Sequence, residues 1–236
     1  MNGDKTAFLT IESKHEKEEK EKLTIKTENN KIIKEDETLK ILGFQQNRNN
    51  TMDSHLNATA AKVGMNIANL KPALPYLSEK NRKEIITSKI KSIALYGIQI
   101  MIGQNQQILH KAESIIMRIN RLMTSNPEGL RSDEAICKYV GVDQPRQDIL
   151  KSNFLMIHKI LEKMKPDQII NHLNFPNRIC GQITIKNYPQ SERSKRSPLY
   201  SGLKLYNAIP QNYRILPNKV LKKKLQKLEI KYSPYK

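Results

Sequence analysis

The most constraining feature of the chain is one continuous amphipathic stripe near its middle. In residues 105–124, apolar side chains recur at spacings of three and four, which places them on one face of a helix. Lys111, Arg118 and Arg121 lie off this stripe or beside it. The apolar members of the stripe are Ile108, Leu109, Ala112, Ile115, Ile116, Ile119, Leu122 and Met123. Because such a face must be buried, the sequence predicts a helix packed among other helices.

Periodicity and capping residues predict further helices on both sides of this one. Residues 52–70 and 146–164 show the same apolar period. Ser78, Ser132 and Ser197 are placed as helix N-caps, and a proline follows the last of them. The helix that starts after Ser78 is expected to bury Ile86, Ile90, Ile93, Gly97 and Ile100.

The first part of the chain carries short β-compatible segments instead of helical ones. These are residues 7–11, 23–25, 31–33 and 38–44, and an Asn turn at residues 28–30 joins the second to the third. We expect residues 38–44 to form one strand that leaves the sheet. Isolated hairpins are marginal in water, so this corner needs support from other residues.

The predicted fold class is mainly α, with a small N-terminal β hairpin or strand corner followed by a helical bundle and a basic helical tail. The expected division is residues 1–50, residues 51–173 and residues 174–236. The tail is expected to open with an exposed loop that holds one strand at residues 183–185. It should end in a helix that begins near Pro217.

The positive charge of the chain is concentrated toward its C-terminus. The formal net charge is +18, but residues 1–40 carry a net charge of −1, and residues 186–236 hold 13 basic and only 2 acidic side chains. Such an excess favours polyanionic partners and specifies no fold. A merely solvated face is the alternative to contact with nucleic acid. The clustered side chains that we expect to bind nucleic acid are Arg193, Lys195, Arg196, Lys222, Lys223 and Lys224.

Four tyrosines are interleaved with this basic segment: Tyr188, Tyr200, Tyr206 and Tyr213. Such rings stack on bases in proteins that bind single strands. The spacing of Tyr200 and Tyr206 with neighbouring leucines also fits the buried face of a helix. We therefore expect most of these tyrosines to pack the last helices.

No pattern of catalytic or metal-binding residues stands out. Nucleotidyl transfer with two metal ions needs clustered carboxylates, yet no Asp-Asp pair occurs, and Glu35-Asp36-Glu37 has no apolar strand before it. The five histidines and two cysteines do not approach zinc-ligand spacing. We expect no metal, no cofactor and no catalysis by this chain alone, and His110 to be a helix-surface residue.

The sequence also predicts an intracellular protein of the nucleus or cytoplasm. Two cysteines, Cys137 and Cys180, are too few for a disulfide framework. No segment approaches the roughly 18–20 apolar residues that cross a bilayer. The start of the chain lacks the pattern of a signal peptide. We therefore expect no membrane partner.

Several short motifs follow one another along the chain in one order. They are residues 2–9, Asn-Gly-Asp-Lys-Thr-Ala-Phe-Leu, residues 39–43, Leu-Lys-Ile-Leu-Gly, and residues 95–97, Leu-Tyr-Gly. In this order they resemble the end of the palm and the thumb region of non-LTR retrotransposon (LINE- and jockey-like) reverse transcriptases. The first is similar to the strand that follows the catalytic aspartates, the second to the L-K-x-L-G motif, and the third to a Y-G in a thumb-region helix. The stripe with Arg118 and Arg121 resembles the next helix of that family.

The tail motif is the most specific part of this resemblance. Residues 197–210, Ser-Pro-Leu-Tyr-Ser-Gly-Leu-Lys-Leu-Tyr-Asn-Ala-Ile-Pro, resemble R-S-x-F-x-S-x-x-L-W-N-x-L-P, with Tyr206 in place of Trp. Residues 131–142 are similar to a short helix that ends in L-G-[IV]. Residues 220–222 stand where the family often has F-K. The motifs together span nearly the whole chain.

The resemblance implies a C-terminal fragment of an RNA-directed DNA polymerase that retains template–primer binding. The catalytic aspartates would precede Met1, so magnesium would be needed only by the intact polymerase. Lys5 is then expected to approach the triphosphate leaving group, and Leu42, Gly43 and Phe44 to contact the primer strand. The basic faces of the thumb, with Arg118 and Arg121, are expected to bind the nucleic-acid duplex. Ala7 departs from the family's Glu at that place.

Two other interpretations remain open at this point. The chain can be a helical protein-interaction module, or a decayed retroelement product with no activity. If the chain is instead a polymerase fragment, its expected partner is RNA or an RNA–DNA hybrid, bound non-specifically. A missing N-terminal polymerase portion is then a second expected partner. The preferred nucleic acid and the oligomeric state do not follow from the sequence.

Overall fold

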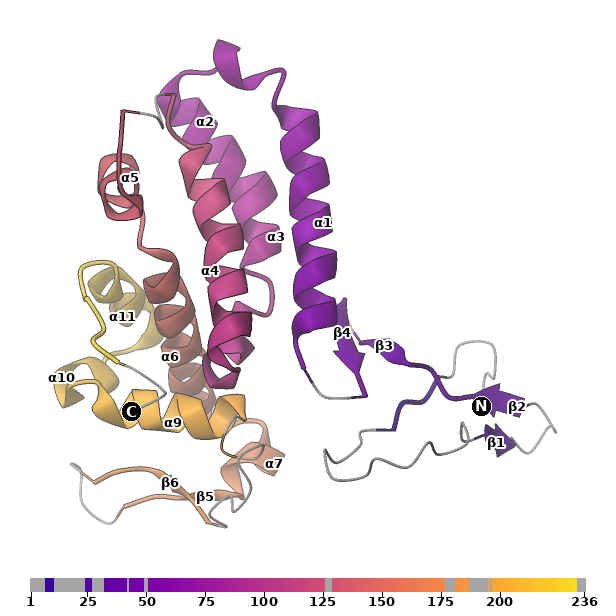
Figure 1. Cartoon of the computed structure of the whole chain (residues 1–236). Coiled ribbons are helices and arrows are strands. Elements are labelled where there is room, and N and C mark those ends of the chain that lie inside the picture. Colours follow the sequence, from indigo (N-terminus) through magenta and orange to yellow (C-terminus); the bar gives the residue numbers. More distant parts are fainter. Residues whose placement is uncertain are drawn as a thin grey trace. The chain divides into compact units, whose positions relative to one another are not determined.

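The computed structural model is mainly helical, as predicted from the sequence (Figure 1). Its contacts divide the chain into two compact units, residues 1–61 and residues 62–236. In the part that is described, no helix is long and apolar enough to span a membrane. The described residues are 7–10, 24–26, 32–41, 43–48, 51–125, 129–176, 181–186, 195 and 197–232.

The first unit contains two short antiparallel strand pairs. Strand β1 (Thr24–Lys26) pairs with β2 (Ile32–Lys34), which confirms the predicted hairpin. Strand β3 (Thr38–Ile41) pairs with β4 (Phe44–Asn47), so the expectation of one strand over residues 38–44 was wrong. Gly43 lies at φ 85°, in the left-handed region that glycine adopts readily. The chain therefore reverses at this glycine and forms a second hairpin.

Glu35 is a central polar residue of the first unit. Phe8 forms a parallel β-bridge with it, and the Thr10 amide donates to its carboxylate at 3.0 Å. The same carboxylate forms an ion pair with Arg48 at 2.6 Å, and Glu35 is only 6% exposed. A buried carboxylate is stable when a cation and an amide share its charge, and Arg48 and Thr10 supply them.

Helix α1 (Asp53–Leu70) confirms the helix predicted from the period of residues 52–70. A 3₁₀ turn, η1 (Leu74–Tyr76), precedes α2 (Glu79–Ile86). The Ser78 hydroxyl caps α2 by accepting from the Asn81 amide at 3.3 Å, as predicted. The buried Arg82 guanidinium donates to the carbonyls of Leu74 at 2.6 Å and Thr124 at 2.8 Å.

The segment after α2 is less regular than the sequence predicts. Helix α2 continues through a π-helical turn, η2 (Thr87–Lys91), into the short α3 (Ser92–Ala94). Gly97 does not lie inside a long helix, since its φ of 70° ends the helical run and starts the 3₁₀ helix η3 (Ile98–Gly103). Ile86 and Ile90 are buried as expected, but Ile93 and Ile100 are only partly covered.

Helix α4 (Gln106–Arg121) is the helix that the apolar stripe predicts. The Asn105 side chain caps it by accepting from the Ile108 amide at 2.9 Å. Helix α5 (Asp133–Val140) starts at the predicted Ser132 cap and ends at Gly141, whose φ is 66°. It packs on α4 through a small cluster of Met117, Ile136 and Cys137.

Helix α6 (Pro145–Lys163) and helix α9 (Pro198–Ala208) pack on each other and on η3. Figure 1 shows α9 running past the lower end of α6. Phe154, Ile157 and Leu205 are among the most deeply buried residues of this core. The remaining short elements of the second unit are α7 (Asp167–Ile170), β5 (Leu173–Asn174), β6 (Thr184–Ile185), α10 (Gln211–Arg214) and α11 (Asn218–Leu225).

The tail motif of residues 197–210 consists largely of packing and capping residues. The Ser197 hydroxyl caps α9 by accepting from the Tyr200 amide at 3.2 Å. The Asn207 amide group donates to the Ile183 carbonyl at 2.8 Å and its oxygen accepts from the Ile183 amide at 3.2 Å, which fastens the β6 segment to α9. The tyrosines of α9 pack as predicted, because Tyr200 and Tyr206 are both buried, as are Leu203 and Ile209.

Candidate nucleic-acid interface

Helix α11 presents the densest group of exposed cations in the described part of the tail. Leu221 and Leu225 are buried, one helical turn apart, where α11 packs on α6. The three lysines between them are exposed, and we call them the α11 lysine cluster: Lys222, Lys223 and Lys224. Successive helical residues are rotated by about 100°, so the three side chains fan over the solvent side of the helix. The two leucines fix the helix and leave the cluster facing water.

Two further lysines extend this cluster, although the sequence analysis did not single them out. Lys219 and Lys227 are exposed and stand four residues before and after Lys223. Lys219 belongs to the first turn of α11, and Lys227 follows its last turn. The i, i+4 spacing places side chains along one side of a helix. From the sequence alone, this spacing could have shown that Lys219 and Lys227 extend the α11 lysine cluster.

Helix α4 carries the second predicted group, Arg118 and Arg121, on its exposed side. Both residues are exposed, one helical turn apart, as the stripe predicts. The Arg121 guanidinium forms an ion pair with Asp133 at 2.6 Å, with side-chain exposures of 56% and 59%. Exposed pairs of this kind contribute about 0–1 kcal/mol. A phosphate can therefore exchange with Asp133 at little free-energy cost.

An acidic neighbourhood limits the reach of this α4 face. Glu113 accepts from Arg146 at 3.1 Å and lies 3.2 Å from His110, which is 70% exposed as expected for a surface residue. These residues line a pocket of about 450 Å³ together with Asp133 and Glu134. Three carboxylates beside two basic groups make the pocket unattractive to a phosphate backbone.

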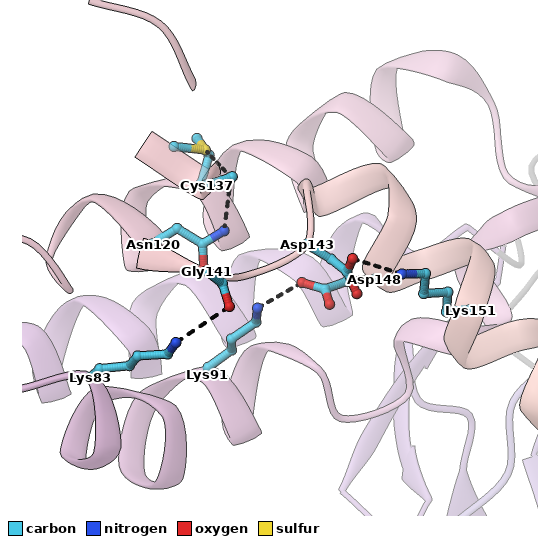
Figure 2. A network of polar contacts seen from close by, with 9 residues as sticks. Lys83, Lys91, Asn120, Cys137, Gly141, Asp143, Asp148 and Lys151 are labelled. Carbon is cyan, nitrogen blue, oxygen red and sulfur yellow. Dashed lines mark hydrogen bonds and ion pairs between the residues drawn. The ribbon is translucent and has the colours of Figure 1, made fainter. Parts of the chain in front are cut away.

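Several lysines that contribute to the net charge are occupied inside the fold (Figure 2). The Lys91 ammonium lies 2.7 Å from the Asp148 carboxylate, and Lys151 lies 2.7 Å from Asp143. Lys83 donates to the Val140 carbonyl at 2.6 Å. These cations serve internal contacts and are not available to a polyanion.

Figure 2 also shows how these contacts join α5 and α6 to the helices before them. Burial raises the pKa of Asp148 above its ordinary value, and the Lys91 charge opposes that effect. Asn120 donates to the Cys137 sulfur at 3.6 Å, and burial raises the pKa of this thiol. The contacts therefore form a structural network that ties these helices together, although the buried Asn120 Oδ1 has no hydrogen-bond partner among the described residues.

The two remaining groups of predicted contacts are only partly described. Lys5, Leu42, Arg193 and Arg196 lie outside the described residues. Lys195 is half-buried, and its carbonyl accepts from the Ser201 hydroxyl at 3.2 Å.

In the first unit, Gly43 is exposed in the turn between β3 and β4. Phe44 is half-buried, and its ring stacks on His55 with centroids 4.1 Å apart. The Phe44 ring, which was expected to contact the primer, thus already stacks on His55. The expectation for this turn stays a prediction.

No cluster of three or more metal-ligating side chains occurs among the described residues. No protein-family model, no curated protein and no solved structure matches this chain. The resemblance to non-LTR reverse transcriptases therefore rests on the sequence motifs alone.

Proposed function

We propose that this chain binds RNA or an RNA–DNA hybrid through the phosphate backbone, without sequence preference. The observation that carries the proposal is the α11 lysine cluster, which is exposed on a helix anchored by Leu221 and Leu225. In this proposal the second unit acts as the thumb-like region of a non-LTR reverse transcriptase, a role that the motif resemblance supports.

The physical basis is the release of counterions from nucleic acid. The cluster forms no ion pair with any described residue, so no internal carboxylate has to be displaced. Adjacent ammonium groups on one helix repel one another, and phosphates that lie between them relieve this repulsion. Such contacts give affinity without sequence preference.

The α4 arginines supply a second contact in this proposal. Arg118 is exposed, and Arg121 can exchange its exposed pair with Asp133 for a phosphate. Helices α4 and α11 both pack on α6, so one rigid helix supports both groups. We expect Arg118→Gln with Arg121→Gln to weaken binding further when the α11 lysine cluster is also neutralised.

The test compares two triple variants that remove the same charge. One replaces the α11 lysine cluster with glutamine, and the other replaces exposed lysines elsewhere: Lys62, Lys71 and Lys80. Binding to labelled single-stranded RNA is measured over a salt series. Because each phosphate contact on a single strand contributes about 0.7 to the slope of log affinity against log salt, the cluster variant should lose about 2 from the slope. Equal losses in both variants would show that net charge alone, and not this helix, attracts RNA.

A second candidate function is docking of a protein partner. Exposed apolar residues favour it, because Ile215 is 69% exposed and Val220 is 43% exposed on the two sides of Pro217. Binding through such residues depends weakly on salt. A salt-independent association that Ile215→Ser abolishes, in a chain that binds no RNA at low salt, would establish this second function.

A further inference from the structure

A pocket of about 290 Å³ lies where the end of α6, α9 and α10 meet the start of α11. Its apolar wall includes Leu161, Leu216 and Pro217, and the Tyr206 ring contributes an aromatic surface. Three groups that can form hydrogen bonds complete the lining: His158, Glu162 and Arg214. The volume lies just below the usual range for pockets that bind drug-sized ligands, ~300–1,000 Å³, and is therefore suited to a small ligand such as one ring system.

His158 is the deepest polar residue of this pocket. Its side chain is nearly closed off from solvent, at 4% exposure, and its ring lies beside Tyr206 with centroids 6.2 Å apart. Among the described residues, neither ring nitrogen meets a hydrogen-bond partner of good geometry, although the Leu216 backbone lies near. Burial lowers the pKa of His158, and the Leu216 backbone and the Glu162 charge oppose this shift. A neutral imidazole has one donor and one acceptor, and the Leu216 backbone competes with a ligand for one of them.

Arg214 also lies against the Tyr206 ring and lines the same pocket. Its guanidinium carbon is 5.8 Å from the centroid of the Tyr206 ring, and the Tyr206 hydroxyl donates to its carbonyl at 3.4 Å. The buried Arg214 Nε forms no hydrogen bond to any described residue. A donor left unsatisfied in a buried place destabilises the fold, so a ligand that accepts a hydrogen bond from it is favoured.

The pocket adjoins the basic helix. Glu162 accepts from the Asn218 amide at 3.2 Å and from its side-chain nitrogen at 3.1 Å, which holds the start of α11 at the pocket. Lys219 follows in the first turn, and the α11 lysine cluster lies in the next. An eight-residue helix is about 12 Å long, a span that a few nucleotides cover.

We propose that this pocket receives one unpaired nucleobase from a strand whose phosphates lie on α11. A nucleobase combines a flat apolar face with an edge of donors and acceptors, and this chemistry matches the Tyr206 wall together with His158 and Arg214. An apolar side chain of a protein partner would leave both polar groups unsatisfied. The inference rests on the proposed function, because the α11 lysines hold the strand.

The experiment uses the full chain and short RNA strands of equal length that differ only in one central abasic position. Wild-type protein should bind the intact strand about tenfold more tightly, which corresponds to ~1.4 kcal/mol. His158→Leu should abolish this preference without changing the salt dependence. Lys159→Gln, the matched control on the exposed side of α6, should keep the preference.

A second measurement needs no variant. Strands with a photoreactive uridine are crosslinked to wild-type protein, and the attached peptides are identified by mass spectrometry. Crosslinks at residues 158, 206 or 214–217 are expected. Equal affinity for intact and abasic strands, or crosslinks only outside these residues, would overturn the pocket while leaving the phosphate contacts in place. Binding of neither strand at low salt would overturn the proposed function as well. Displacement of the bound base by an acidic peptide with one leucine would assign the pocket to a protein partner instead.

Discussion

Replacing Gly202 with alanine is expected to destabilise the second unit, because α9 lies close against α6 at this residue. A Cβ atom at position 202 would stand 2.8 Å from Asn153 Oδ1 and 2.8 Å from Ile157 Cγ1. Asn153 is fully buried and Ile157 nearly so, which means that neither side chain can swing into solvent. The two helices must therefore separate or distort to accept one methyl group.

The expected magnitude follows from two opposing effects. Overpacking of a filled core costs about 1–3 kcal/mol. Alanine is more favourable than glycine inside a helix by about 0.8–1.0 kcal/mol, which offsets part of that cost. Because Asn153 and Ile157 are both buried, the overpacking cost is expected in the upper half of its range, and the net loss in the free energy of unfolding should be about 1–2 kcal/mol.

The matched control is Gly64→Ala in α1, where an added Cβ would meet no atom within 4 Å. Only the helix-propensity effect operates there, so this variant should gain about 1 kcal/mol. Thermal unfolding followed by circular dichroism measures both variants, and each kcal/mol corresponds to about 2–4 °C for a chain of this size. A melting temperature of Gly202→Ala equal to or above that of the wild type would refute the close packing of α9 on α6.

Three further predictions concern the polar network, a helix end and pH. Lys91→Met should lower the free energy of unfolding by about 3–5 kcal/mol, because it leaves the Asp148 carboxylate buried without its cation. The double variant Lys91→Met with Asp148→Leu should recover most of this loss, and denaturant titrations measure both. A double variant as unstable as Lys91→Met would contradict this. Gly141→Ala should cost about 1 kcal/mol in the same assay, since φ is 66° at the end of α5, and an unchanged midpoint would count against that conformation. Acidification below about pH 6.5 should destabilise the fold through His158, because the unfolded histidine takes up a proton before the folded one, whose pKa is lowered. Between pH 7.5 and pH 5, the melting temperature of His158→Leu should fall less steeply than that of the wild type. Parallel curves for the two proteins would show that His158 does not cause the loss of stability in acid.

The helices that could be predicted are those whose whole length shows one apolar period, with a side-chain cap as in α4 or without one as in α6. The stripe of residues 105–124 forms helix α4, Gln106–Arg121, because burial of its apolar face and the Asn105 cap both favour a helix there. Ser132 and Gly141 defined α5 for the same reason. The segment around Gly97 was misread, since its apolar period continues although the backbone turns left-handed at the glycine. Period alone does not reveal such a turn.

The candidate interface divides in a similar way. Exposure of Arg118 and of the α11 lysine cluster follows from helical phase relative to buried neighbours, which the sequence contains. Pairing of Arg121 with Asp133, and burial of Lys91 against Asp148, depend on which helices come together. The same holds for the pocket, where residues from α6 and α10 meet. Charge counted along the chain therefore overstates the charge available to a polyanion.

The most direct test of the central claim is binding of the purified wild-type chain to a labelled RNA–DNA hybrid and to single-stranded RNA across a salt series. Backbone binding predicts a linear fall of log affinity with log salt, with a slope that corresponds to several phosphate contacts. No binding to either nucleic acid at low salt would contradict the account and identify the exposed lysines as a solvated surface.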